Sequence, residues 1–118
     1  MTESSSVEIQ FTLEFRKLLK RLSKRYRNIK SDLKPVLQQI SLGELIGDRI
    51  PGVESVVMKV RVKNSDVQKG KRGGYRLVYW KASDELVVLL SIYSKSDRAN
   101  IDATEIYRII SQLEVDFE

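Results

Sequence analysis

The spacing of apolar residues changes from a helical period to that of strands partway along the chain. This change is the strongest constraint on the fold. The first half carries two stripes at the spacing of a helix face: Phe15, Leu18, Leu19, Leu22 and Tyr26, then Leu33, Val36, Leu37 and Ile40. Segments 53–62, 75–80 and 86–93 are instead short and rich in Val, Leu, Ile and Tyr, which is typical of strands. The chain therefore combines helices and strands in separate regions.

Two shorter elements complete the predicted order. Residues 7–11 alternate apolar and polar and predict a short strand before the first helix. Asp102 followed by Glu105 has the spacing of a capping box, and it precedes a third apolar stripe from Ile106 to Leu113. We predict one α+β domain over residues 1–118, after a flexible tail at 1–6. Its order is β-α-α-β-β-β-α, with one twisted, mainly antiparallel sheet and the helices packed against one face.

The composition excludes several kinds of site. The chain has no histidine and no cysteine. Ser-His and Cys-His nucleophile pairs are therefore excluded, as are zinc sites built from those ligands. Catalysis would depend on Lys, Arg, Tyr and carboxylates, with no evident metal-ligand set and no cofactor. The absence of a signal peptide and of a long apolar run predicts a cytoplasmic protein without a membrane segment.

Positive charge is concentrated in the third quarter of the chain. The net charge is +5, yet residues 59–81 alone contain eight Lys or Arg residues and one acid, Asp66. Strand alternation places Lys59, Arg61 and Lys63 on one face, and Arg76 on the next strand can join them. Such a cluster favours an anionic partner. A solvated strand face is the alternative interpretation.

Two further basic groups have open interpretations. Lys71 and Arg72 lie in a glycine-rich loop, whose glycines suit a turn or close approach to a phosphate backbone. The first predicted helix has seven basic residues and no acidic residue over residues 15–27. Lys20, Lys24 and Arg27 are three of these basic residues on its polar side. That side is either a soluble surface or a docking surface for RNA.

Tyr93 and Lys95 follow the most apolar strand. A tyrosine beside a lysine could stack on a base or assist proton transfer. It could equally close the core, and the sequence does not decide between these roles.

Three segments of this half resemble the strands of RelE/HigB-type toxins of bacterial toxin–antitoxin systems. They are Met58-Lys59-Val60-Arg61-Val62, Gly74-Tyr75-Arg76-Leu77-Val78-Tyr79 and Leu90-Ser91-Ile92-Tyr93-Ser94-Lys95. The resemblance extends over nearly the whole chain and is most specific in the Gly-Tyr-Arg-Leu-Val-Tyr run. It implies a RelE-like fold and an endonuclease that cleaves mRNA in the ribosomal A site. Its implied partners are mRNA, ribosomal RNA and a cognate antitoxin protein.

The resemblance also implies site residues. Lys59 and Arg61 match the basic pair of the family's second strand, Arg76 matches the arginine of the third, and Lys95 matches a basic residue after the last. Where the RelE branch has a catalytic tyrosine, this chain has Ile101, and Tyr93 is the nearby substitute.

These residue types suit attack of a 2′-hydroxyl on the adjacent phosphate. Lys59 would act as the base, Arg61 and Arg76 would bind the phosphate oxygens, and Lys95 or Tyr93 would donate a proton to the leaving oxygen. Two other functions remain open on the same pattern. One is a ParE-like inhibitor of DNA gyrase, and the other is a non-catalytic RNA- or ribosome-binding protein.

Overall fold

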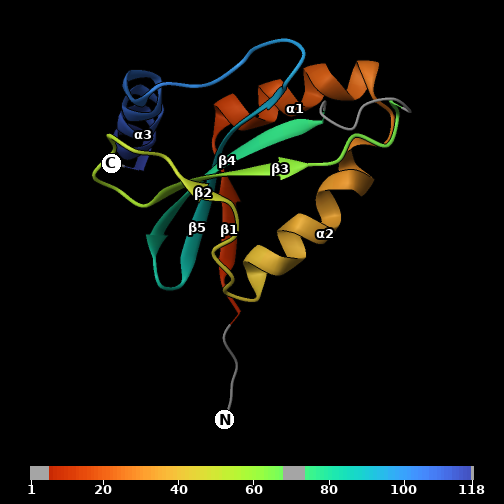
Figure 1. Ribbon diagram of the computed structural model, residues 1–118. Helices are drawn as coiled ribbons and strands as arrows, with labels where there is room; N and C mark the ends of the chain where they lie inside the picture. Colours follow the sequence, from red (N-terminus) through yellow and green to blue (C-terminus); the bar gives the residue numbers. More distant parts are fainter. Residues whose placement is uncertain (1–5, 68–73, 118) are drawn as a thin grey trace.

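A computed structural model describes residues 6–67 and 74–117 and contains five strands and three helices (Figure 1). In chain order they are β1 (Glu8–Phe11), α1 (Leu13–Arg25), α2 (Ile29–Ser41), β2 (Asp48–Arg49), β3 (Val57–Val62), β4 (Tyr75–Ser83), β5 (Leu86–Ser94) and α3 (Ala103–Phe117). The predicted α+β order is confirmed, with one addition. The two-residue strand β2 is not among the elements that the sequence predicted. Most of the predicted tail, residues 1–5, lies outside the described part.

All five strands form one sheet in the order β1-β5-β4-β3-β2. Three neighbouring pairs are antiparallel, and only β1 and β5 run parallel, so the mainly antiparallel prediction is confirmed. β5 has a neighbour on each side and is buried from Val87 to Ser94. Its nearly unbroken apolar sequence therefore reflects burial on both faces.

Both faces of the sheet are covered, which corrects the expectation that all helices pack on one face. α1 and α2 cover the face that includes Met58, Val62 and Leu77, through buried side chains such as Phe15 and Leu33. α3 covers the other face, where Ile106 and Ile109 contact the cluster containing Val57, Val78 and Val88. Figure 1 shows α3 and α2 at opposite sides of the sheet. Successive β5 residues belong to different clusters, such as Val87 and Val88, so that strand is apolar on both sides.

The predicted cap of α3 is present. The backbone N–H of Glu105 donates to the Asp102 side chain at 3.0 Å. The Tyr107 hydroxyl of α3 accepts a hydrogen bond from the backbone N–H of Glu54, in the segment before β3. This bond joins the first turns of α3 to the segment that leads into β3. In the described part of the chain, no helix is long and apolar enough to cross a membrane.

Thr12 joins α1 to the sheet and carries a first prediction. Its buried side-chain oxygen accepts from the backbone N–H of Phe15 at 3.0 Å, and its hydroxyl lies 3.2 Å from the carbonyl oxygens of Leu89 and Leu90 on β5. Thr12→Ala removes this N-cap, so we expect it to lower the free energy of unfolding by about 1–2 kcal/mol. Thr12→Ser keeps the hydroxyl and should be clearly less destabilised in a urea titration. Equal destabilisation of the two variants would show that the hydroxyl does not stabilise the fold.

Candidate functional site

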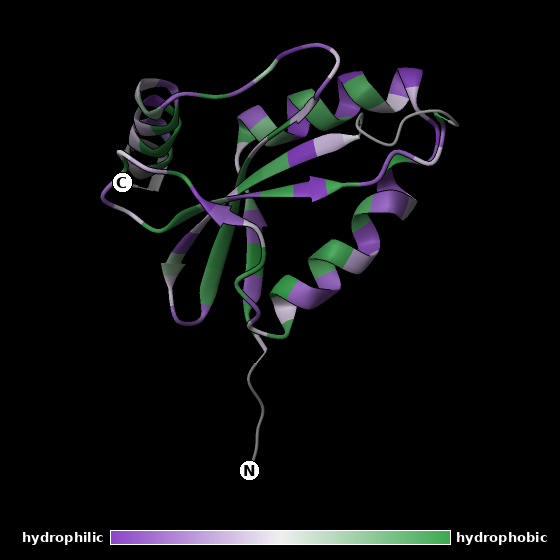
Figure 2. Ribbon diagram, viewed as in Figure 1, coloured by the Kyte–Doolittle hydropathy of each residue, from purple (hydrophilic) through white to green (hydrophobic). Residues whose placement is uncertain are grey.

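Strand pairing brings three predicted cations onto one face of the sheet. Arg61 on β3 lies directly opposite Arg76 on β4, and Lys59 lies two residues before Arg61 on the same face. Residues directly opposite on antiparallel strands have neighbouring side chains. Val57, two residues before Lys59 on the same face, is buried in the cluster beneath α3, whereas Lys59 and Arg76 are half-buried and Arg61 is exposed. Figure 2 shows hydrophilic stretches in the otherwise hydrophobic β3 and β4. We call Lys59, Arg61 and Arg76 the cationic row.

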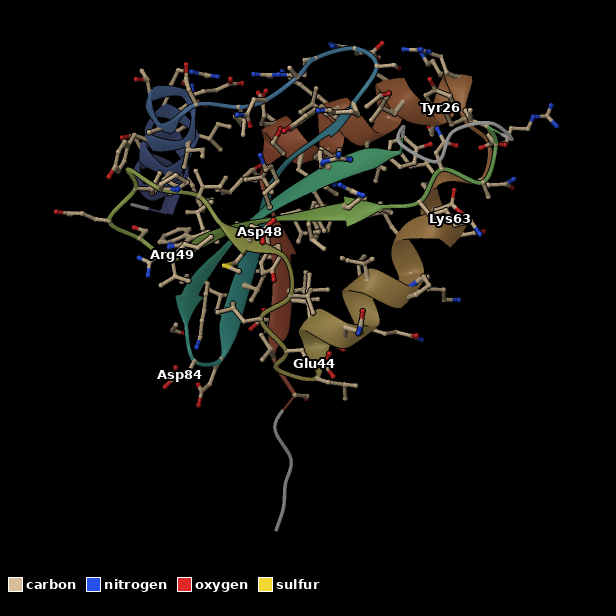
Figure 3. All side chains as sticks on the ribbon, viewed as in Figure 1. Tyr26, Glu44, Asp48, Arg49, Lys63 and Asp84 are labelled. Carbon is tan, nitrogen blue, oxygen red and sulfur yellow. The ribbon has the colours of Figure 1, made fainter. Side chains whose placement is uncertain are left out.

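Lys59 is half-buried, and its amine has a defined hydrogen bond. Its Nζ donates to the side-chain oxygen of Asn100 at 2.9 Å. Asp48 on β2 lies opposite Lys59 in the strand register (Figure 3), yet the lysine bonds to Asn100 instead. The ammonium group is thus held toward the segment that connects β5 to α3.

Arg76 lies between Arg61 on one neighbouring strand and Tyr93 on the other. One of its guanidinium nitrogens donates to the backbone carbonyl of Tyr75 at 3.3 Å. Tyr93 is only 5% exposed and packs in the cluster beneath α3. Burial raises the pKa of the Tyr93 phenol, and the charges of Arg76 and Arg98 partly oppose this shift.

The Tyr93 hydroxyl is enclosed and has no hydrogen-bond partner among the residues that the structure describes. Lys95 follows the end of β5 and is exposed, and its backbone N–H bonds the carbonyl of Gly74 at 3.0 Å. Of the two candidate proton donors, Lys95 is therefore the one that a substrate can reach in this conformation.

Arg98 is a fourth cation at the site that the sequence did not single out. Its guanidinium carbon lies 5.2 Å from the centre of the Tyr93 ring. It also forms an ion pair with Glu105 on α3 at 2.7 Å, and this hydrogen bond raises the pKa of the guanidinium. Arg98 lies in an irregular loop between β5 and α3, so no periodic pattern in the sequence marked it as a site residue.

Comparison of the sequence with models of known protein families identifies the family of this chain. The profile of the RelE toxin of the RelE/RelB toxin–antitoxin system matches residues 15–114. The chain belongs to the RelE toxin family. The matched region includes the whole cationic row, Tyr93 and Lys95. A search of curated proteins finds no match.

Membership makes the chain a toxin of a toxin–antitoxin system, with a RelB-type antitoxin as its partner. The position at which we expected a catalytic tyrosine in the RelE branch is filled by Ile101, which is 3% exposed and packs beneath α3. An apolar core residue thus occupies this position in the toxin. Among the described residues, no group of acidic side chains is arranged to hold a metal ion.

Of the other predicted RNA-binding residues of this RelE-family toxin, the four that the structure describes lie outside the cationic row. Lys63 follows the end of β3 and is exposed, at the side where α1 and α2 meet (Figure 3). Lys20 and Lys24 are exposed on α1, and Arg27 is exposed just after it. α1 covers the opposite face of the sheet, although Arg25 at its end reaches Asp97 at 2.8 Å. Lys71 and Arg72 lie outside the described residues.

Proposed function

We propose that this toxin is a ribosome-dependent mRNA endonuclease. The observation that carries the proposal is the cationic row on the paired strands β3 and β4, where Arg61 is exposed and Lys59 and Arg76 are half-buried. Fixed cations stabilise charge that develops on a phosphate in the transition state. Family membership makes RNA the expected anion.

The proposed reaction needs no residue beyond this site. Lys59 accepts the proton of the 2′-hydroxyl, and the 2′-oxygen forms a bond to the adjacent phosphorus. Arg61 and Arg76 donate hydrogen bonds to the non-bridging oxygens as their negative charge grows. The bond from phosphorus to the 5′-oxygen breaks, and Lys95 gives that oxygen a proton. The products are a 2′,3′-cyclic phosphate and a 5′-hydroxyl, and no metal ion takes part.

The proposed partners follow from this chemistry and from the charge distribution. The substrate is mRNA held in the ribosomal A site, so the toxin would act in the cytoplasm. We keep Lys63, Lys71 and Arg72 as proposed RNA contacts on the ground of their charge, and of these three the structure describes Lys63 alone, as an exposed side chain. The antitoxin would neutralise the toxin with an acidic segment that covers the cationic row or displaces the C-terminal helix over residues 102–115, because a basic surface of this kind attracts polyanions.

The exposed cations of α1 are proposed to dock on ribosomal RNA. Reversing Lys20, Lys24 and Arg27 to Glu should weaken ribosome binding. It should also reduce the slope of log affinity against log salt by about 0.7–0.9 for each phosphate that the variant no longer binds. Lys30→Glu, Lys34→Glu and Arg108→Glu together are the control for net charge, since this variant also reverses three exposed cations and all three lie on other helices. Equal slopes for the two variants in a salt titration would eliminate specific docking through α1.

The proposed function is tested against its alternatives with purified toxin. We expect cleavage of a defined mRNA on translating ribosomes and no inhibition of gyrase supercoiling. Inhibition of gyrase without RNA cleavage would establish the ParE-like alternative. Ribosome binding without cleavage would establish a non-catalytic role.

A further inference from the structure

Asn100, in the connection between β5 and α3, binds the Lys59 amine through its side chain. Its side-chain oxygen accepts from Lys59 Nζ and from the backbone N–H of Ile101, both at 2.9 Å. Two donors meet at one atom, so this atom must be the oxygen rather than the nitrogen of the amide. The orientation of the Asn100 amide is thus determined by its neighbours.

The backbone on both sides of Asn100 is also held in place. Arg98 Nε donates to the Asn100 carbonyl at 3.0 Å, and Arg98 is itself paired with Glu105 at the start of α3. Ile101, the next residue, is buried in the cluster beneath α3. The acceptor for Lys59 is therefore attached to the folded core, although Asn100 itself is exposed.

We infer that Asn100 is a positioning residue that holds the Lys59 amine for the proposed cleavage. This inference rests on the proposed function. A lysine side chain has a flexible four-carbon stem, so an amine without a fixed partner occupies many positions. A general base must lie within hydrogen-bond reach of the proton that it removes. Because the hydrogen bond to Asn100 fixes the position of Nζ, the remaining directions around this nitrogen face away from that acceptor and are available to the 2′-hydroxyl.

The test compares cleavage rates in a double-mutant cycle. Asn100→Ala should slow single-turnover cleavage on ribosomes about tenfold, the scale of removing one hydrogen bond to a charged group, with ribosome affinity unchanged. In a Lys59→Met background the same substitution should slow the residual rate by less than about twofold, because the amine that Asn100 holds is already absent. Asn28→Ala is the matched control, since Asn28 is an exposed asparagine that bonds Asp66 instead. An equal effect of Asn100→Ala in both backgrounds, or no effect in either, overturns the inference.

A second measurement does not depend on activity. The NMR order parameter of the Lys59 ε-methylene should exceed that of exposed Lys17 in the wild-type toxin and fall to a similar value in Asn100→Ala. A mobile Lys59 in the wild type overturns the inference. A wild-type toxin that cleaves, with Asn100→Ala equally fast, overturns the positioning role alone. A wild-type toxin with an ordered Lys59 that never cleaves mRNA overturns the proposed function, and with it the reaction that this positioning serves.

Discussion

Replacing Arg76 with Ala is expected to slow mRNA cleavage on ribosomes by about 10²–10³-fold, the usual effect of removing one preorganised donor to a transition-state oxyanion. Ribosome affinity should change far less, because the guanidinium contributes most once negative charge has grown on the phosphate. Arg76→Lys should restore little of the rate, since an ammonium group does not offer two parallel donors. Single-turnover rates and binding constants measured together separate these effects.

Two controls make the Arg76 experiment decisive. Arg49→Ala removes an exposed arginine of the same sheet that bonds the Glu54 carbonyl and lies outside the cationic row (Figure 3). It should cleave at the wild-type rate. Thermal unfolding should show that Arg76→Ala remains folded, because Arg76 lies on a strand face outside the two buried clusters. A folded Arg76→Ala variant with wild-type cleavage would show that the cationic row is not the active site.

Replacing Gly47 with Ala is expected both to lower the free energy of unfolding and to slow cleavage. Gly47 has φ +97°, and an added Cβ would lie 2.5 Å from the backbone oxygen of Lys59. The left-handed conformation costs a non-glycine residue about 1–2 kcal/mol. The clash adds about 1–3 kcal/mol, since the backbone of β3 cannot move without breaking its pairing with β4. Cleavage should fall as well, because any relief of the clash shifts the residue that carries the proposed base.

Gly52 provides the matched control for Gly47. It has φ +82°, yet an added Cβ would meet nothing within 4 Å. Gly52→Ala should therefore show only the conformational cost and keep its activity. The two free energies of unfolding are compared by urea titration. Equal destabilisation of the two variants would mean that the approach of Gly47 to β3 is unimportant.

Four of the five strands of the sheet could be predicted because strand alternation is a local property, whereas the two-residue β2 is too short to show it. Lys59 and Arg61 share a face whatever the rest of the fold does, and the apolar run of β5 marks a strand that is covered twice. The side of the sheet that α3 covers could not be predicted in this way. Both faces of β5 are apolar, so the sequence pattern does not indicate against which face α3 packs.

The finer parts of the site depend on tertiary contacts that leave no periodic signal. Asn100 and Arg98 lie in an irregular segment, and each acquires its role from a residue elsewhere in the chain: Lys59 for Asn100, Tyr93 and Glu105 for Arg98. The same holds for Tyr93, whose possible roles depend on whether its ring and hydroxyl are exposed or buried. The structure encloses that hydroxyl, whereas Lys95 remains exposed.

In the proposed reaction this toxin uses the RNA's own 2′-hydroxyl to cleave mRNA on the ribosome. The most direct measurement compares two mRNAs that differ by a single 2′-O-methyl group at the nucleotide before the scissile bond. Both are placed in the A site of purified ribosomes, and the 3′ ends of the products are identified by mass spectrometry. We expect cleavage of the unmodified mRNA to a 2′,3′-cyclic phosphate, and no cleavage at the methylated position. Cleavage of both mRNAs at the same rate, or none of either by folded toxin, would contradict this mechanism.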